Sequence, residues 1–240
     1  MRGLQRAISW IYPAQCLVCT GLVEEHGGLC ADCWRQTPFL SGLVCDSCGC
    51  ALPGDSDQKE LCDVCLAVPR PWEAGRAAIA YRDLGRRLVL SLKHGDRTDL
   101  AAPAAEWMWR AGRPILPDDV LFVPVPIHWS RLLMRRFNQS AELARALANL
   151  TGFEAGPDAL TRTRRTPVQD GMSIEERYQN MDGAIQTNPQ RRSLLRGRDV
   201  CIIDDVMTSG ATMTACTEAL HAAGAKRVFV LVLARVEKST

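Results

Sequence analysis

The hydrophobic positions of the chain predict buried strands that are separated by helices. Continuous apolar runs, which are typical of strands covered on both faces, occupy residues 120–125, 200–203 and 228–233. A fourth strand is predicted at residues 77–81. The helices that the apolar spacing predicts are 84–92, 100–111, 140–150 and 211–223. Because strands and helices alternate, we expect an α/β fold whose mainly parallel sheet has helices on both faces.

The first residues have a weaker pattern. Residues 1–12 are mildly apolar at helical spacing and predict a short amphipathic helix. Pro13 and Cys16 end this segment before the apolar region of a signal peptide forms. No apolar run approaches the roughly 20 residues that a membrane helix needs. We therefore expect a cytoplasmic protein without membrane insertion.

The chain divides into two parts of different character. Its 240 residues, of which 47% are apolar and 23% charged, suit a medium domain plus a small one. Residues 66–73 carry two prolines and predict a linker, so we expect domains at 1–68 and 74–240. Within the second domain, residues 157–198 are polar, Arg-rich and weakly periodic, and we expect a flexible segment there. Residues 1–75 have a net charge of −4 and the remainder +6.

Cysteine spacing is the strongest signal in the first part. Eight cysteines form four C-x-x-C pairs, and two such turns supply the four thiolates of a tetrahedral zinc site. The sequence therefore predicts two structural Zn²⁺ ions. The simplest pairing joins the first turn to the second and the third to the fourth, although a crossed pairing fits the spacing as well. The predicted ligands are Cys16, Cys19, Cys30, Cys33, Cys45, Cys48, Cys62 and Cys65.

Other interpretations of these cysteines are weaker. Disulfides need an oxidising compartment, and a redox C-x-x-C occurs once within a βαβ pattern rather than four times in a row. Cys50 lies beside the third turn, and we interpret it as a small buried apolar residue. The alternative hypothesis is that it is a spare or alternative zinc ligand.

A second signal follows the apolar run at 200–203. Two acids, Asp204 and Asp205, precede a loop of small residues and then a predicted helix. Backbone N–H groups of such a loop and of a helix N-terminus bind anions, and Gly210 allows close approach of the backbone to a ligand. The adjacent carboxylates suit sugar hydroxyls or a magnesium shell. The segment is neither a Walker A loop nor a Rossmann fingerprint, and it predicts a site for a ribose 5-phosphate group.

These thirteen residues, 200–212, resemble the phosphoribosyl pyrophosphate (PRPP) motif of type I phosphoribosyltransferases, and the whole chain resembles the ComF branch of that superfamily. The ComF family has an N-terminal double zinc ribbon, which the four C-x-x-C pairs match. Arg136 stands where the family usually has glycine. The other stretches that carry the resemblance are 92–95, 123–126, 135–139, Arg162, Thr166, Gln169 and 176–180.

The resemblance implies a Rossmann-like type I phosphoribosyltransferase fold, PRPP binding and magnesium bound with PRPP. In this family the acids hold the ribose hydroxyls, the loop takes the 5′-phosphate, and a loop after an earlier strand takes the pyrophosphate. The implied PRPP-binding residues are Asp204, Asp205, Thr208, Ser209, Gly210, Ala211 and Thr212. The implied pyrophosphate-loop candidates are Pro126, Arg131, Arg135, Arg136 and Lys93. The Arg-rich residues 161–180 fit either a flap that closes over PRPP or a solvated basic loop.

Three functions remain open at this point. The first is a phosphoribosyltransferase-like protein in competence, DNA uptake or nucleotide metabolism, as the resemblance implies. The second is a non-catalytic module that binds single-stranded DNA through basic residues and the aromatic residues Trp129, Phe137 and Tyr178. The third uses the acidic ribbons to dock a protein partner, for example a competence helicase or a DNA-processing protein.

Overall fold

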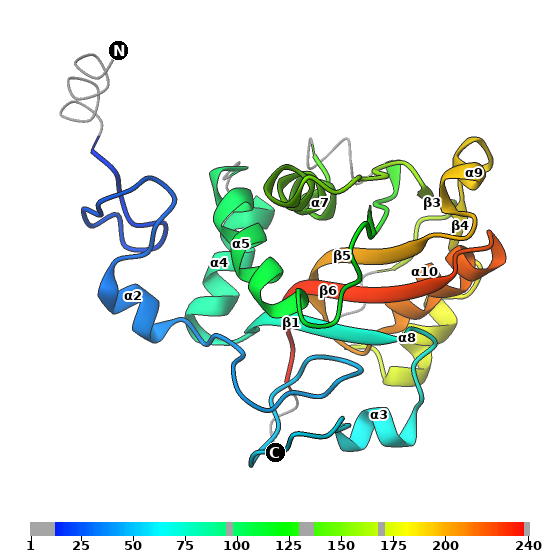
Figure 1. Ribbon diagram of the computed structural model, residues 1–240, viewed down its shortest axis with the longest axis horizontal. Helices are drawn as coiled ribbons and strands as arrows, with labels where there is room; N and C mark the ends of the chain where they lie inside the picture. Colours follow the sequence, from blue (N-terminus) through cyan, green and yellow to red (C-terminus); the bar gives the residue numbers. More distant parts are fainter. Residues whose placement is uncertain (1–12, 95–97, 130–136, 168–170, 238–240) are drawn as a thin grey trace.

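A central parallel sheet of four strands organises the chain. The computed structural model describes residues 13–94, 98–129, 137–167 and 171–237. The strand order is β1-β6-β5-β2, and all three pairings are parallel. The strands are β1 (Ala74–Ala80), β2 (Leu121–Pro124), β5 (Asp199–Met207) and β6 (Arg227–Arg235). The predicted mainly parallel sheet is confirmed (Figure 1).

Helices cover both faces of this sheet. On one face lie α4 (Asp83–His94), α5 (Ala101–Gly112) and α7 (Gln139–Thr151), and α5 follows the short 3-10 helix η1 (Thr98–Leu100). On the other face lie α8 (Ile174–Met181) and α10 (Ala211–Ala222) (Figure 1). The four predicted helices correspond to α4, α5, α7 and α10, within a residue or two at each end.

Alternation along the central strands explains why the apolar runs are continuous. Ile203 and Leu231 contribute to the core under α4, α5 and α7, whereas their neighbours Ile202 and Val230 contribute to the core under α8 and α10. All four side chains are fully buried. Successive strand residues point to opposite faces, so a strand between two helix layers needs an apolar residue at every position.

Strand β5 is longer than its apolar run. The sequence predicts a strand at 200–203 that ends before the acids, but the structure continues β5 to Met207. The extension pairs with β6 from Asp204, opposite Val232, to Met207, opposite Arg235. The partner strand stays apolar over this stretch and satisfies the backbone of β5, so polar side chains do not end the strand. Asp204 and Asp205 therefore lie within β5.

The Arg-rich segment 157–198 contains short elements that the sequence pattern does not indicate. A two-stranded antiparallel sheet and helix α8 occupy its first part, and two short helices follow. These elements are β3 (Leu160–Arg162), β4 (Ile185–Thr187), η2 (Pro189–Arg191) and α9 (Arg192–Leu195). Strands of three residues with one buried position are too short for a periodic signal.

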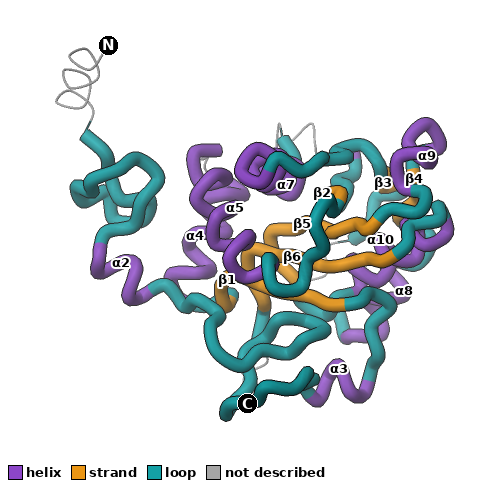
Figure 2. The backbone as a smooth tube through the Cα atoms, viewed as in Figure 1, coloured by secondary structure: helices purple, strands orange, loops and turns teal. Residues whose placement is uncertain are grey.

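The cysteine-rich part consists mostly of loops and packs along strand β1. Its helices are α2 (Ala31–Gln36) and α3 (Asp63–Ala67), as Figures 1 and 2 show. Leu40 N–H donates to the Ala78 carbonyl, and Ala80 N–H donates to the Pro38 carbonyl, so residues 38–40 cover the edge strand β1. The helix predicted at 1–12 lies outside the described residues. Within the described residues, no helix has the length and apolar character needed to cross a membrane.

Candidate functional site

The eight predicted cysteine ligands form two sets of four. One contains Cys16, Cys19, Cys30 and Cys33, and the other contains Cys45, Cys48, Cys62 and Cys65. Within each set the sulfur atoms lie within 4.8 Å of one another, which suits tetrahedral thiolate coordination of zinc. The sequential pairing is therefore confirmed, and both sets are closed sites of the structural kind.

Cys50 lies beside the second set but is not a member of it. Its carbonyl accepts a hydrogen bond of 2.8 Å from the Cys45 N–H, and its side chain is only partly buried against the core. Gly49, in the same turn, has a φ of 70°, and a Cβ there would lie 2.6 Å from the Ala77 nitrogen. The second zinc turn therefore packs directly against strand β1 and requires glycine at this position.

The acid pair of β5 is held by residues from two other elements. Lys93, near the end of α4, places its Nζ 3.2 Å from Asp205 Oδ2. Ser140, in the first turn of α7, donates a hydrogen bond of 2.7 Å to Asp204 Oδ1. That same oxygen accepts from the Asp205 N–H at 2.9 Å. Asn138 caps α7 and donates to the Val125 carbonyl at 3.0 Å, which fixes this helix start to the end of β2.

The environment of Asp204 raises the pKa of its carboxyl to about 7. Burial is the largest cause, and the neighbouring carboxylate of Asp205 adds repulsion in the same direction. The hydrogen bond from Ser140 and the charge of Lys93 oppose this rise. Asp204 thus changes its charge near neutral pH.

The loop after β5 leads directly into α10. Gly210 is the N-cap of this helix, with a left-handed φ of 89°. The first N–H groups of a helix have no partners within the helix, and together with the helix dipole they favour an anion at this end. A Cβ at Gly210 would lie 3.1 Å from an Arg70 nitrogen and 3.2 Å from the Trp72 ring. Glycine is therefore favoured by the left-handed backbone conformation, and a Cβ would also crowd the residues behind the loop.

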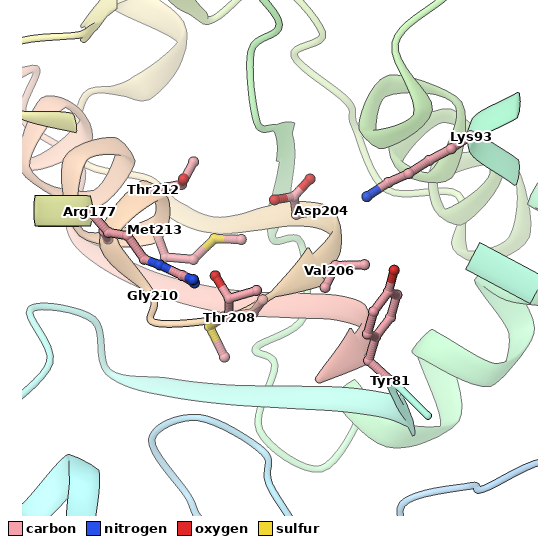
Figure 3. A pocket seen from close by; sticks show the side chains of 11 residues that line it. Tyr81, Lys93, Arg177, Asp204, Val206, Thr208, Gly210, Thr212 and Met213 are labelled. Atoms are coloured by element: carbon pink, nitrogen blue, oxygen red, sulfur yellow. The ribbon is translucent and has the colours of Figure 1, made fainter. Parts of the chain in front are cut away.

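Two adjoining cavities lie between these elements. The larger, of about 240 Å³, is lined by the predicted residues Lys93, Asp204, Thr208, Gly210, Ala211 and Thr212. In Figure 3, Lys93 and Asp204 point toward each other across it, with Thr208 and Thr212 nearby. The smaller, of about 130 Å³, shares Lys93, Asp204 and Thr212 with the first and adds Asp205 and Pro126. The ends of β2 and β5, the end of α4 and the start of α10 thus converge on one polar site.

Most of the predicted site residues are brought together here. Ser209 does not line either cavity: its hydroxyl accepts from the Ala211 N–H at 3.4 Å, and its carbonyl accepts from the Tyr178 hydroxyl at 3.4 Å. The pyrophosphate-loop candidates Arg131, Arg135 and Arg136 lie outside the described residues.

Several lining residues were assigned no individual role by the sequence analysis. Tyr81 and Arg177 line the larger cavity, and Arg162 and Asn138 line the smaller one. Arg177 reaches the loop from α8, and Tyr81 faces it from the end of β1 (Figure 3). Arg162, Asn138 and Arg177 fall in stretches that resemble ComF motifs, which was the available signal for them. No local pattern marks Tyr81, because only the sheet brings β1 close to the end of β5.

Comparison with known proteins agrees with this architecture. The double zinc ribbon domain family matches residues 7–66, and the phosphoribosyl transferase domain family matches residues 141–240. DNA utilization protein YhgH of Salmonella typhi is 32% identical to this chain over 233 residues, covering 93% of this chain and 97% of the relative. Competence protein F of Haemophilus influenzae is 25% identical over 229 residues, covering 92% and 96%. The chain belongs to the ComF family.

Solved structures also resemble this ComF-family chain. Glutamine PRPP amidotransferase from B. subtilis has a TM-score of 0.39 and 17% identity, covering 59% of this chain and 30% of that one. HGPRT-ase from Leishmania tarentolae has a TM-score of 0.32 and 14% identity, covering 65% and 73%. The predicted type I phosphoribosyltransferase fold with an N-terminal zinc ribbon is confirmed by the matched domains, the parallel sheet and the cysteine sets.

Proposed function

We propose that this ComF-family chain binds PRPP with magnesium in the two adjoining cavities and acts as a phosphoribosyltransferase-like protein. The observation that carries the proposal is the convergence of an acid pair, a lysine and the N-terminus of α10 on one site. A ribose ring needs carboxylate acceptors for its hydroxyls, and its 5′-phosphate needs N–H donors. The site offers these two chemistries side by side.

Each group then has a defined part. Asp204 and Asp205 accept hydrogen bonds from the ribose hydroxyls, and residues 208–212 hold the 5′-phosphate at the start of α10. Lys93, together with the predicted loop residues Pro126, Arg131, Arg135 and Arg136, holds the pyrophosphate. Magnesium prefers oxygen ligands and would be held by the carboxylates and PRPP oxygens, where it neutralises the charge of the leaving pyrophosphate.

Transfer would break the bond between the ribose C1 and a pyrophosphate oxygen, and pyrophosphate would leave with the electron pair of that bond. An acceptor atom would supply the electron pair for the new bond to C1. Asp204 and Asp205, by holding the hydroxyls on the ring, would fix the orientation of C1. Arg162 and Arg177, which line the cavities, add positive charge on the side of the Arg-rich segment. We propose that this segment, residues 161–180, covers bound PRPP.

Calorimetry with PRPP, with and without magnesium, tests the binding. Thr212 lines both cavities, so Thr212→Val removes a hydroxyl donor and should weaken PRPP binding by about tenfold. Thr214→Val is the matched control on the same helix, because the Thr214 hydroxyl is buried without a hydrogen-bond partner among the described residues and lines neither cavity. Asp205→Asn should reduce the gain in affinity that magnesium gives.

Two results would contradict this assignment. One is wild-type protein that shows neither heat nor thermal stabilisation at ~1 mM PRPP with magnesium. The other is equal affinity of the Thr212 and Thr214 variants for PRPP. If the protein binds PRPP but releases no pyrophosphate with any nucleobase or DNA end, the result supports PRPP binding and contradicts the transfer reaction.

The names of the relatives favour a role with DNA. They are called DNA utilization protein and Competence protein F. We propose that this chain acts in the cytoplasm on DNA taken up during competence, and that its partners are single-stranded DNA and a competence helicase or DNA-processing protein. In this proposal residues 1–68 form the ribbon domain and residues 74–240 form the phosphoribosyltransferase domain. The non-catalytic alternative, a module that only binds DNA or a protein, differs in predicting no PRPP-dependent reaction.

A further inference from the structure

The second zinc set lies directly behind the loop that leads into α10, and two residues of the connecting segment span the gap. Trp72 Nε1 donates a hydrogen bond of 2.6 Å to the carbonyl of Ser47, which lies within the Cys45–Cys48 turn. The far edge of the same ring lies 3.2 Å from the point where a Cβ of Gly210 would be. Trp72 is only 5% exposed, so this contact is part of the core.

Arg70 makes the second connection. Its guanidinium lies close to Cys65 of the zinc set and donates a hydrogen bond to the hydroxyl of Tyr178 on α8. One guanidinium nitrogen lies 3.1 Å from the Cβ position of Gly210, and the group sits over the Trp72 ring, 5.6 Å from its centroid. One half-buried cation therefore contacts the metal set, the loop and the helix of the Arg-rich segment.

Tyr178, the partner of Arg70, is next to a residue that lines the larger cavity. The Tyr178 hydroxyl lies 3.4 Å from the Ser209 carbonyl, so Arg70 and the loop share this side chain. The preceding residue on α8, Arg177, lines the larger cavity. A shift of Tyr178 would consequently move both the loop backbone and a cationic wall of the site.

Arg235 supports the other end of the loop. This side chain is 6% exposed and donates to the carbonyls of Met207 and Thr208, at 3.1 Å and 2.6 Å. Four thiolates on one zinc ion would carry more negative charge than the ion neutralises, so the cations Arg70 and Arg235 near the second set are electrostatically favoured there.

We propose that Arg70 is a positioning residue that connects the second zinc site to the anion-binding loop, so that an intact ribbon sets the conformation of residues 208–212 and of α8. The effect on PRPP rests on the proposed function, whereas the effect on the loop does not. In this arrangement the second ribbon is a structural wall of the ligand site, and loss of its zinc would loosen the loop without removing any group that touches the ligand.

The experiment compares Arg70→Gln with Arg76→Gln in the full chain with zinc bound. Arg76 is a matched control, because it ties the same zinc turn to β1 through a 2.6 Å ion pair with Asp46 and lines neither of the two adjoining cavities. Amide hydrogen exchange is measured first. In Arg70→Gln, residues 207–212 and 174–181 should exchange about tenfold faster or more, while β1 and α4 stay unchanged. Arg70→Lys, which keeps the charge but not the fork of donors, should restore part of the protection.

Ligand binding gives the second readout. Arg70→Gln should weaken PRPP and ribose 5-phosphate by about tenfold, since both use the loop, and should leave pyrophosphate within about twofold. Arg76→Gln should leave all three unchanged. If Arg70→Gln does not fold, Tyr178→Phe serves instead, because it removes the hydroxyl that Arg70 and the loop share.

The outcomes separate the two proposals. Faster exchange of the loop in Arg70→Gln, with no PRPP binding even by the wild type, supports the connection and contradicts the proposed function. Unchanged loop exchange in Arg70→Gln and in Tyr178→Phe would overturn the connection, whatever PRPP does. Equal changes in Arg70→Gln and Arg76→Gln would also overturn it, since they would indicate a general loss of ribbon packing.

Discussion

Lys93 forms an ion pair of 3.2 Å with Asp205, and this pair joins the end of α4 to β5 at the point where the two cavities meet. Their side chains are 21% and 11% exposed, so the ion pair is largely buried away from water. Two carboxylates on adjacent residues repel each other, and Lys93 is the cation that offsets this repulsion.

Lys93→Gln should therefore destabilise the fold. The variant leaves a largely buried carboxylate without its cation, and the free energy of unfolding should fall by about 1–3 kcal/mol. Urea denaturation at neutral pH measures this change. The exposed Lys59, in the ribbon, provides the control Lys59→Gln, which should remain within about 0.5 kcal/mol of wild type. Equal stabilities of the Lys93 and Lys59 variants would mean that the ion pair contributes nothing to folding.

The zinc content of cysteine variants should distinguish the eight zinc ligands from Cys50, the thiol beside the second set. Purified protein should hold two zinc ions per chain, in line with the two cysteine sets. Cys62→Ser removes a ligand of the second set and should leave one ion, whereas Cys50→Ser should keep both. Elemental analysis of the purified variants gives the counts directly. Loss of zinc from Cys50→Ser would show that the fifth thiol of this region coordinates the metal.

The parts of the molecule that the sequence could predict are those with a local cause. C-x-x-C spacing arises from the geometry of one metal, and it predicted the eight ligands and two sites, with the sequential pairing as the simplest option. Burial on both faces makes a strand continuously apolar, and it predicted the positions of β2, β5 and β6. A glycine in a loop of small residues before a helix predicted the start of α10.

The remaining features depend on contacts between distant residues. Ser140 and Asp204 are 64 positions apart, so no spacing indicates their hydrogen bond. The polar end of β5 becomes strand only because β6 continues beside it. Arg70 has the appearance of an ordinary linker residue, and its role beside Gly210 depends on how the ribbon packs.

Single-stranded DNA should bind weakly and lose affinity steeply with salt, if the basic second domain contacts phosphates. The structure selects the residue to change. Arg164 donates to the carbonyls of Asn180 and Asp182, at 3.0 Å and 2.7 Å, so its replacement would disturb local structure. Arg165 is exposed, and Arg165→Glu should weaken binding and reduce the salt slope by about 1. Arg113→Glu, at the exposed end of α5, is the charge-matched control. Affinity that does not change with salt would contradict a phosphate-based interface.

The raised pKa of Asp204 predicts how stability depends on pH. Its carboxyl has a pKa of about 7 in the fold against 3.8 ordinarily, so the folded state binds more protons than the unfolded state between these values. The free energy of unfolding should therefore decrease as pH rises from about 4 to 7, as far as this group determines it. Asp204→Asn stays neutral and should lack that decrease, so its stability relative to wild type should increase between pH 5 and pH 8 in urea titrations. A constant difference would indicate an ordinary pKa.

Ser140 provides a sharper check on the same carboxyl. Its hydroxyl donates to Asp204 Oδ1 at 2.7 Å and lowers the pKa of that group, against the effects of burial and of Asp205. Ser140→Ala should therefore move the titration midpoint of Asp204 above 7, as followed by NMR of the labelled carboxyl carbon. In the proposed function the charged carboxylate takes part in magnesium-dependent PRPP binding, which should then require a higher pH in Ser140→Ala than in wild type. The phosphate groups of PRPP titrate in the same way in both measurements, so a difference between the two binding profiles comes from the protein. If the binding profiles of wild type and Ser140→Ala coincide while the NMR midpoint moves, Asp204 is not the acid that binds the ligand.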